Sequence, residues 1–204
     1  MKGEHKFSIP GPSGVLQGVM HMPASEPRAV AIVAHPLPTM GGTMDNKIVT
    51  TLVKTFAELG FVALRFNFRG VGDSSGSFDE GNGEVEDVLA VADYAIQEFG
   101  KLPLILSGFS FGGYVQARAA GQLHPKHMIL VAPAVGHFAM PHVPANTLVI
   151  HGEMDEVVAL NDVLTWARPQ HLPIVLIPEA THYFHGNLHL IKSIVSHHFT
   201  GSSL

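Results

Sequence analysis

Short apolar runs alternate along this chain with segments whose apolar residues recur at helical spacing. Residues 29–34 form an unbroken apolar run, which is typical of a strand buried on both faces of a parallel sheet. The apolar positions beyond Asp45 are Ile48, Leu52, Phe56 and Leu59. With acidic Asp45 at the first turn and Gly60 as a stop signal, this spacing predicts a helix directly after a central strand.

The same alternation continues through the rest of the chain. Further strands are expected over residues 14–22, 61–68, 104–107, 128–131, 147–151 and 174–177. Further helices are expected over residues 85–99, closed by Gly100, and over 111–120, 157–167 and 188–199. A strand–helix series of this kind predicts an α/β fold with a mostly parallel sheet, helices on both faces and functional loops at the carboxyl ends of the strands.

Composition narrows the class of protein. The 204 residues are 46% hydrophobic and 14% charged, which fits one core-rich domain over residues 1–204. The net charge is -5 and no cluster of lysine or arginine occurs, so we expect no nucleic-acid partner. Residues 1–10 lack the apolar core of a signal peptide, and no later apolar stretch approaches about 18 residues. We therefore expect a cytoplasmic protein without a membrane partner.

A candidate nucleophile lies in the pentapeptide Gly-Phe-Ser-Phe-Gly at residues 108–112. It follows the strand expected at 104–107 and precedes a helical segment, which is the context that the G-x-S-x-G motif requires. Glycine on both sides of Ser110 lets neighbouring elements approach without a clash at Cβ. The chain has no cysteine, so Ser110 is our candidate nucleophile.

A serine hydroxyl needs a base to take its proton and an acid to orient that base, and the expected chain order is serine, acid, histidine. Asp155 follows the strand expected at 147–151 and is our candidate acid, with Glu153 and Glu156 as competitors. Asp155 could also cap the helix expected from Val157, and the two roles are compatible.

The candidate base is His182, in the loop that follows the last strand, at residues 174–177. His185 is its rival, although we interpret His185 as a polar residue near the start of the last helix. Because a protonated imidazole cannot accept the serine proton, activity should fall on acidification.

Acyl transfer also requires two donors for an oxyanion. One is expected to be the backbone amide of Phe111, which follows the nucleophile. The other should come from the loop after the central strand, where the sequence is His35-Pro36-Leu37-Pro38. Proline has no amide hydrogen, so Leu37 is the expected donor within that loop.

Several blocks together carry a resemblance to a known family. They are His-Pro-Leu-Pro at 35–38 with Gly-Gly-Thr-Met-Asp-Asn-Lys at 41–47, Asn-Phe-Arg-Gly-Val-Gly at 67–72, the pentapeptide at 108–112 and His-Tyr-Phe-His-Gly at 182–186. Over about residues 14–199 the chain resembles small bacterial lidless α/β-hydrolases, near dienelactone hydrolases and carboxylesterases. Dienelactone hydrolases commonly use cysteine where this chain has Ser110, which argues against that particular reaction.

The resemblance implies an α/β-hydrolase fold without a cap domain and an open site. It assigns Ser110, Asp155 and His182 as the catalytic triad, and Leu37 and Phe111 as the oxyanion donors. The connection at 133–146, which holds three prolines, is too short for a helical lid. The loop at 67–74 could border the pocket, but we interpret it as structural.

The predicted function is hydrolysis of small soluble carboxylic esters through an acyl-enzyme, with thioester, lactone or amide hydrolysis as alternatives for the same triad. A metallohydrolase using His182, His185 and His189 is a weaker alternative, because no H-E-x-x-H motif or acidic partner accompanies them. A non-catalytic binding module is a third. We expect no cofactor, since no nucleotide-binding motif is present, and a monomer or homodimer acting on a small-molecule ester.

Overall fold

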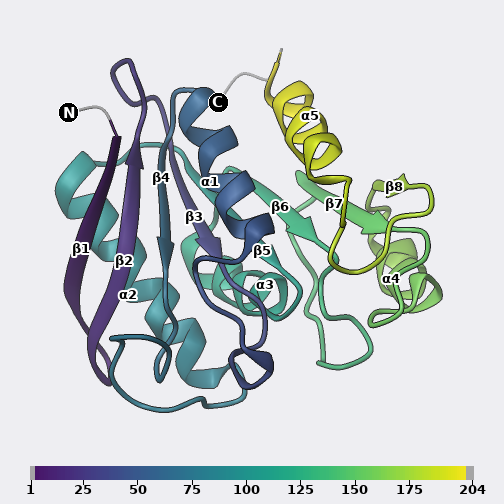
Figure 1. The fold of residues 1–204 in the computed structure, drawn as a ribbon, viewed down its shortest axis with the longest axis horizontal. Coiled ribbons are helices and arrows are strands. Elements are labelled where there is room, and N and C mark those ends of the chain that lie inside the picture. Colours follow the sequence, from purple (N-terminus) through teal and green to yellow (C-terminus); the bar gives the residue numbers. More distant parts are fainter. Residues whose placement is uncertain (1–2, 201–204) are drawn as a thin grey trace.

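The computed structural model describes residues 3–200, which form one eight-stranded sheet covered by helices (Figure 1). The strands are β1 (Gly3–Gly11), β2 (Gly14–Met22), β3 (Val30–Ala34), β4 (Val62–Phe66), β5 (Leu104–Phe109), β6 (His127–Val131), β7 (Thr147–Gly152) and β8 (Ile174–Ile177). Their order across the sheet is β1-β2-β4-β3-β5-β6-β7-β8. Strands β3 to β8 run parallel, whereas β2 is antiparallel to both β1 and β4. The mostly parallel sheet predicted from the sequence is confirmed.

Helices cover both faces of this sheet, as predicted. They are α1 (Lys47–Glu58), α2 (Asn82–Phe99), α3 (Phe111–Leu123), α4 (Leu160–Ala167) and α5 (Leu188–Phe199), with short 3-10 turns at Pro38–Met40 and Arg168–Gln170. Apolar residues of α1 and α5 share one core, and those of α2 and α3 share the core on the opposite face (Figure 1).

The central strand β3 explains how one sheet serves two cores. Ala31 and Val33 belong to the core of α1 and α5, whereas Val30 and Ile32 belong to the core of α2 and α3. Side chains alternate between faces along a strand, so a strand covered on both sides is apolar at every position. The unbroken apolar run in the sequence has this physical cause.

Strand β1 was not predicted, and its burial shows why. It is one of the two edge strands of the sheet; within residues 3–200 it pairs only with β2, and Ile9 is its one buried side chain. An edge strand that is exposed over most of its length carries no strong apolar alternation. Its sequence therefore gives little signal.

Three helix starts differ from the prediction, and one of them is that of α2, which begins at Asn82 instead of residue 85. Asp45 lies before α1 and not in its first turn, and its carboxylate pairs with Arg65. The Asn46 side chain caps the helix instead, by accepting a hydrogen bond from the Ile48 amide at 2.8 Å. Helix α4 begins at Leu160 instead of residue 157, because the preceding amides bind the Asp155 side chain in a separate turn.

The connection between β6 and β7 contains no helix, in agreement with the predicted absence of a lid. Across residues 3–200, no helix is long and apolar enough to cross a membrane.

Candidate active site

Ser110 occupies the sharp turn between β5 and α3, at the carboxyl end of a central parallel strand. Its backbone lies at φ 54° and ψ -119°. A non-glycine residue held at such angles costs about 1–3 kcal/mol, which the surrounding packing must offset. The turn presents the serine side chain at the edge of the sheet where functional loops gather.

The two glycines of the motif permit this turn. A Cβ on Gly108 would lie 2.4 Å from the backbone of Gly112, and a Cβ on Gly112 would lie 2.3 Å from the carbonyl oxygen of Ala34. Real Cβ atoms do not approach other atoms so closely, so any side chain here would force the strand, the helix and the loop after β3 apart. The close approach predicted from the motif is confirmed.

The structure brings Ser110, His182 and Asp155 together from three separate loops. His182 Nε2 lies 3.1 Å from Ser110 Oγ, and His182 Nδ1 lies 2.8 Å from Asp155 Oδ2. A neutral imidazole that carries its proton on Nδ1 satisfies both contacts, because it donates to the carboxylate and accepts from the hydroxyl. This arrangement can withdraw a proton from Ser110.

The Asp155 carboxylate is fully buried and fixed on both oxygens. While Oδ2 faces His182, Oδ1 accepts hydrogen bonds from the amides of Val157 and Val158, at 2.9 and 2.7 Å. Burial would raise the pKa of this carboxyl, but the hydrogen bonds from His182 and the two amides outweigh it and hold the pKa below its ordinary value. Asp155 therefore stays ionised where it can stabilise a charged imidazole.

The competing acids do not reach the imidazole ring. Glu153 accepts a hydrogen bond from the Glu179 amide at 3.0 Å, and Glu156 accepts one from the His182 amide at 3.2 Å. Both tie the acid loop to the histidine loop through backbone groups. The rival histidine, His185, is exposed and stacks on Tyr183 at a ring distance of 6.0 Å.

An open cavity of about 620 Å³ lies beside Ser110 and His182. Leu37 and Phe111, the two expected oxyanion donors, also line it. Among the hydrogen bonds within residues 3–200, neither of their amides donates to another protein group, so both stay available to a ligand. The Leu37 carbonyl meanwhile accepts from the amides of Met40 and Gly42, which closes the loop into a tight turn.

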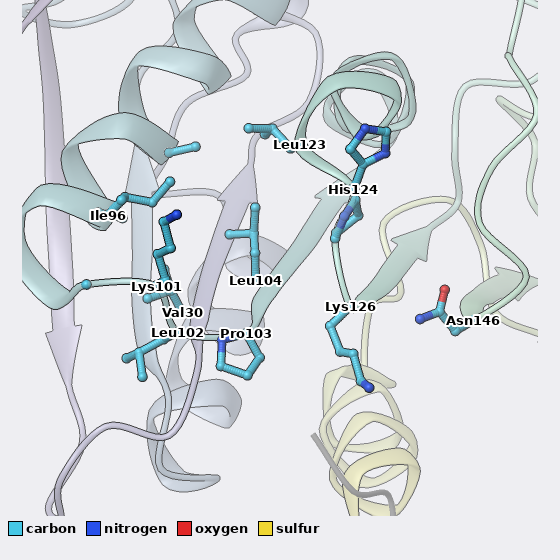
Figure 2. A pocket seen from close by; sticks show the side chains of 14 residues that line it. Val30, Ile96, Lys101, Leu102, Pro103, Leu104, Leu123, His124, Lys126 and Asn146 are labelled. Atoms are coloured by element: carbon cyan, nitrogen blue, oxygen red, sulfur yellow. The ribbon is translucent and has the colours of Figure 1, made fainter.

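A second cavity, of about 700 Å³, lies at the other end of the strands (Figure 2). Val30 and Leu104, the first residues of β3 and β5, line its floor, and Lys101, His124 and Lys126 lie around it. Catalytic loops of parallel sheets gather at the carboxyl ends of the strands. The cavity beside Ser110 is therefore the candidate active site, although it is the smaller of the two.

His35 fixes the loop that carries Leu37. The His35 ring is fully buried, with Nδ1 2.7 Å from the Pro36 carbonyl oxygen and Nε2 3.1 Å from the Phe68 amide. Nδ1–H donates to the first group, and Nε2 accepts from the second, which requires a neutral ring. Burial lowers the pKa of His35 to about 4. The sequence identified this loop but gave no sign of the ring's role, since Phe68 is distant along the chain.

The loop at 67–74 acts as a support, as interpreted from the sequence. The Asn67 side chain accepts from the Met44 amide at 2.9 Å, and Ser74 Oγ donates to the Asn67 carbonyl at 2.7 Å. Arg69 forms a buried ion pair with Asp87 at 2.9 Å. None of these residues lines the cavity beside Ser110.

We expect acidification to destabilise the fold through buried histidines. Because the pKa of folded His35 is about 4 and that of an unfolded histidine about 6.5, the unfolded state binds more protons between these values. The free energy of unfolding should therefore fall as the pH drops through this window, with about 3 kcal/mol from His35 alone. The pKa is also lowered by burial at His21, His127, His151 and His198.

Urea unfolding at about pH 7.5 and about pH 4.5 measures this loss of stability, because the first pH lies above the window between the two pKa values and the second lies near its lower end. His35→Asn cannot be protonated, so its stability should depend less on pH than that of the unmodified protein. His185→Asn, at an exposed histidine, serves as the control and should keep the full dependence. Equal pH dependence in the His35→Asn variant and the unmodified protein would contradict the assignment.

The histidine cluster considered as a metal site does not assemble. Within residues 3–200, no group of three or more histidine, aspartate or glutamate side chains is placed to hold a metal ion. His185 and His189 are exposed, while His182 uses both ring nitrogens in contacts with Asp155 and Ser110.

The family model described as serine aminopeptidase, S33, matches residues 25–146, more than half of the chain. The chain belongs to this family. The match includes Leu37, Ser110 and Phe111 and ends before Asp155 and His182. Membership makes the chain an α/β serine hydrolase, as its resemblance implied.

Solved structures of similar hydrolases agree over nearly the whole chain. XC6422 from Xanthomonas campestris, an α/β serine hydrolase without a lid, is 36% identical with a TM-score of 0.94, covering 100% of this chain and 98% of XC6422. An α/β serine hydrolase homologue from Coxiella burnetii is also 36% identical, with a TM-score of 0.88 and coverage of 98% and 99%. An uncharacterised Rickettsia prowazekii protein is 34% identical over 172 residues, which are 75% of this chain and 68% of that protein. This hydrolase is thus of the lidless type.

Proposed function

We propose that this hydrolase cleaves small carboxylic esters through an acyl-enzyme on Ser110. The observation that carries the proposal is the position of the His182 ring, which bridges the buried Asp155 carboxylate and the Ser110 oxygen at 2.8 and 3.1 Å. The cavity beside this chain of contacts supplies room for a substrate and two unpaired backbone amides.

The reaction runs in two halves. His182 Nε2 takes the Ser110 proton as Oγ attacks the ester carbonyl carbon, and the amides of Leu37 and Phe111 hold the resulting oxyanion. The carbon–oxygen bond to the alcohol then breaks, and the alcohol leaves with the proton from His182. Water repeats the sequence on the acyl-enzyme, with its proton passing to His182 and then to Ser110, which releases the acid. Asp155 stabilises the imidazolium in both halves.

The cavity walls favour short acyl groups. Its outer lining includes Met40, Tyr183 and Val157, whose exposed fractions are 79%, 45% and 41%. Phe184 and Met44, which are close in sequence to these walls, are buried in the protein and do not line the cavity. An acyl chain longer than the cavity would therefore extend into water.

We expect kcat/KM for p-nitrophenyl esters to be highest from acetate to butyrate and then to level off or fall. Each added methylene gains about 0.8 kcal/mol only when it is fully buried, and this open site buries few. Turnover of the ester series, measured below and above the solubility limit of each substrate, tests the expectation. A preference for laurate or longer esters, or a jump in rate at a lipid interface, would overturn the open-site account.

Amide hydrolysis is tested in the same series, because the family description names an aminopeptidase. Aminoacyl p-nitroanilides release a chromophore by cleavage of an amide bond. We expect them to react far more slowly than the short esters. Faster cleavage of the anilides would replace the ester proposal with an amidase, and leave the roles of Ser110 and His182 unchanged.

A further inference from the structure

His151 lies on β7, just before the acid loop, and the reaction described above does not use it. Its side chain is fully buried. His151 Nε2 lies 3.1 Å from the Val158 carbonyl oxygen and 3.7 Å from Asp155 Oδ2. A carbonyl oxygen can only accept, so Nε2 carries the hydrogen and donates it toward the acid loop.

The contacts of Val158 connect His151 to the catalytic carboxylate. The Val158 amide donates to Asp155 Oδ1 at 2.7 Å, while its carbonyl accepts from His151 at 3.1 Å. The Asp155 amide in turn donates to the Gly152 carbonyl at 3.3 Å, next to His151 in the chain. The buried His151 ring therefore holds, through Val158, the turn that directs the Asp155 carboxylate toward His182.

Packing alone gives no reason for a histidine at this position. His151 Nδ1 is buried and has no hydrogen-bond partner among the described residues. A buried polar atom without a partner is unfavourable, and an apolar side chain of similar size would avoid it. The hydrogen bond that His151 Nε2 donates to Val158 must therefore compensate for the unfavourable free energy of burying Nδ1 without a partner.

We propose that His151 is a positioning residue whose Nε2–H holds the turn at 155–158, so that Asp155 Oδ2 points at His182. The inference rests on the proposed function of the triad. His151 does not line the cavity beside Ser110, so we assign it no contact with the substrate.

The charge state of His151 suits this task. Burial lowers the pKa of His151, and the nearby Asp155 charge and the bond to Val158 raise it only in part, while His182 lowers it further. Asp155 and His182 are the charged or titratable groups that act on it. A neutral His151 keeps its donor without competing, as a second cation, for the carboxylate that must stabilise the His182 imidazolium.

The test measures the rate at which a fluorophosphonate labels Ser110, across a range of pH. In this reaction Ser110 Oγ bonds to phosphorus, fluoride leaves, and the serine proton passes to His182. No natural substrate is needed, and the rate depends on the same base. The variants are His151→Gln, which keeps a donor near the position of Nε2, and His151→Leu, which removes it. His127→Leu, at a buried histidine on the neighbouring strand β6, is the matched control.

We expect His151→Leu to lower the plateau labelling rate by about 10- to 100-fold, because the catalytic groups lose their alignment. The pH of half-maximal rate should also move to lower pH, since a misdirected carboxylate stabilises protonated His182 less. His151→Gln and His127→Leu should stay within about threefold of the unmodified protein and keep its midpoint, since both retain the aligned turn. A purely structural role would lower the amount of active protein without moving the midpoint.

Two results would overturn the inference: an unchanged rate and midpoint in His151→Leu, or a His151→Gln variant as impaired as His151→Leu. If His151→Leu does not fold, His151→Asn replaces it, because its shorter amide cannot reach Val158, and the same loss is expected. An unmodified protein that is not labelled at Ser110 would overturn the proposed function and this inference together. A labelled protein with an insensitive His151→Leu variant would overturn this inference alone.

Discussion

Replacing Ser110 with alanine is expected to lower kcat for ester hydrolysis by about 10⁴-fold or more while the fold remains intact. Among the described residues, the Ser110 hydroxyl makes one hydrogen bond, to His182 Nε2, and it lines an open cavity. Removal of that oxygen leaves no group that can form the acyl-enzyme. Alanine adds no volume and meets the same backbone angles, so the thermal midpoint should change little.

Ser107→Ala is the matched control for this substitution. Ser107 lies on β5, the strand that leads into the Ser110 turn; it is fully buried, and its hydroxyl donates to the Ile129 carbonyl at 2.9 Å. Its loss should cost about 1 kcal/mol of stability and leave turnover nearly unchanged. Thermal unfolding and p-nitrophenyl acetate turnover of both variants separate the two roles. Retention of most of the activity in Ser110→Ala would remove Ser110 from the mechanism.

His182→Ala is expected to damage turnover about as severely as Ser110→Ala, since the base and the nucleophile act as one unit. The double variant should therefore be no slower than either single variant. His185→Ala, three positions along in the same loop, should change kcat by less than about threefold, because its exposed side chain does not reach Ser110. If His185→Ala proved the more damaging change, the base would have to be reassigned to His185.

The buried parallel strands and their helices could be predicted because their signal is local. In β3 every position faces a core, so an unbroken apolar run identifies the strand. The edge strand β1 lacked such a signal, since only Ile9 is buried. The start of α4 was predicted too early because the Asp155 side chain competes for the amides at 157 and 158, which the apolar pattern does not reveal.

In the candidate site, too, the features that depend on neighbouring residues in the chain could be predicted, and those that depend on the folded structure could not. The pentapeptide around Ser110 can be recognised in the sequence because its geometry depends on Gly108 and Gly112, which lie two positions before and after the serine. The choice among Glu153, Asp155 and Glu156 could not be read from spacing, since the three acids lie within four positions. The direction of each side chain separates them: only Asp155 contacts the His182 ring.

The structural roles of the His35 and His151 rings could not be predicted from the sequence, although His35 stands in one of the blocks that carry the family resemblance. His35 acts through Phe68, which is 33 positions away, and His151 acts through the folded turn at Val158. Such roles depend on which ring nitrogen meets which backbone group. The sequence shows a histidine at the end of an apolar run but does not show which backbone groups its ring nitrogens contact.

Fluorophosphonate labelling followed by peptide mapping identifies the activated oxygen of this hydrolase without a known substrate. We expect one adduct, on the peptide that contains Ser110, formed by the folded protein and absent from the Ser110→Ala and His182→Ala variants. An adduct on any other residue, or no adduct on the intact folded protein, would contradict this expectation.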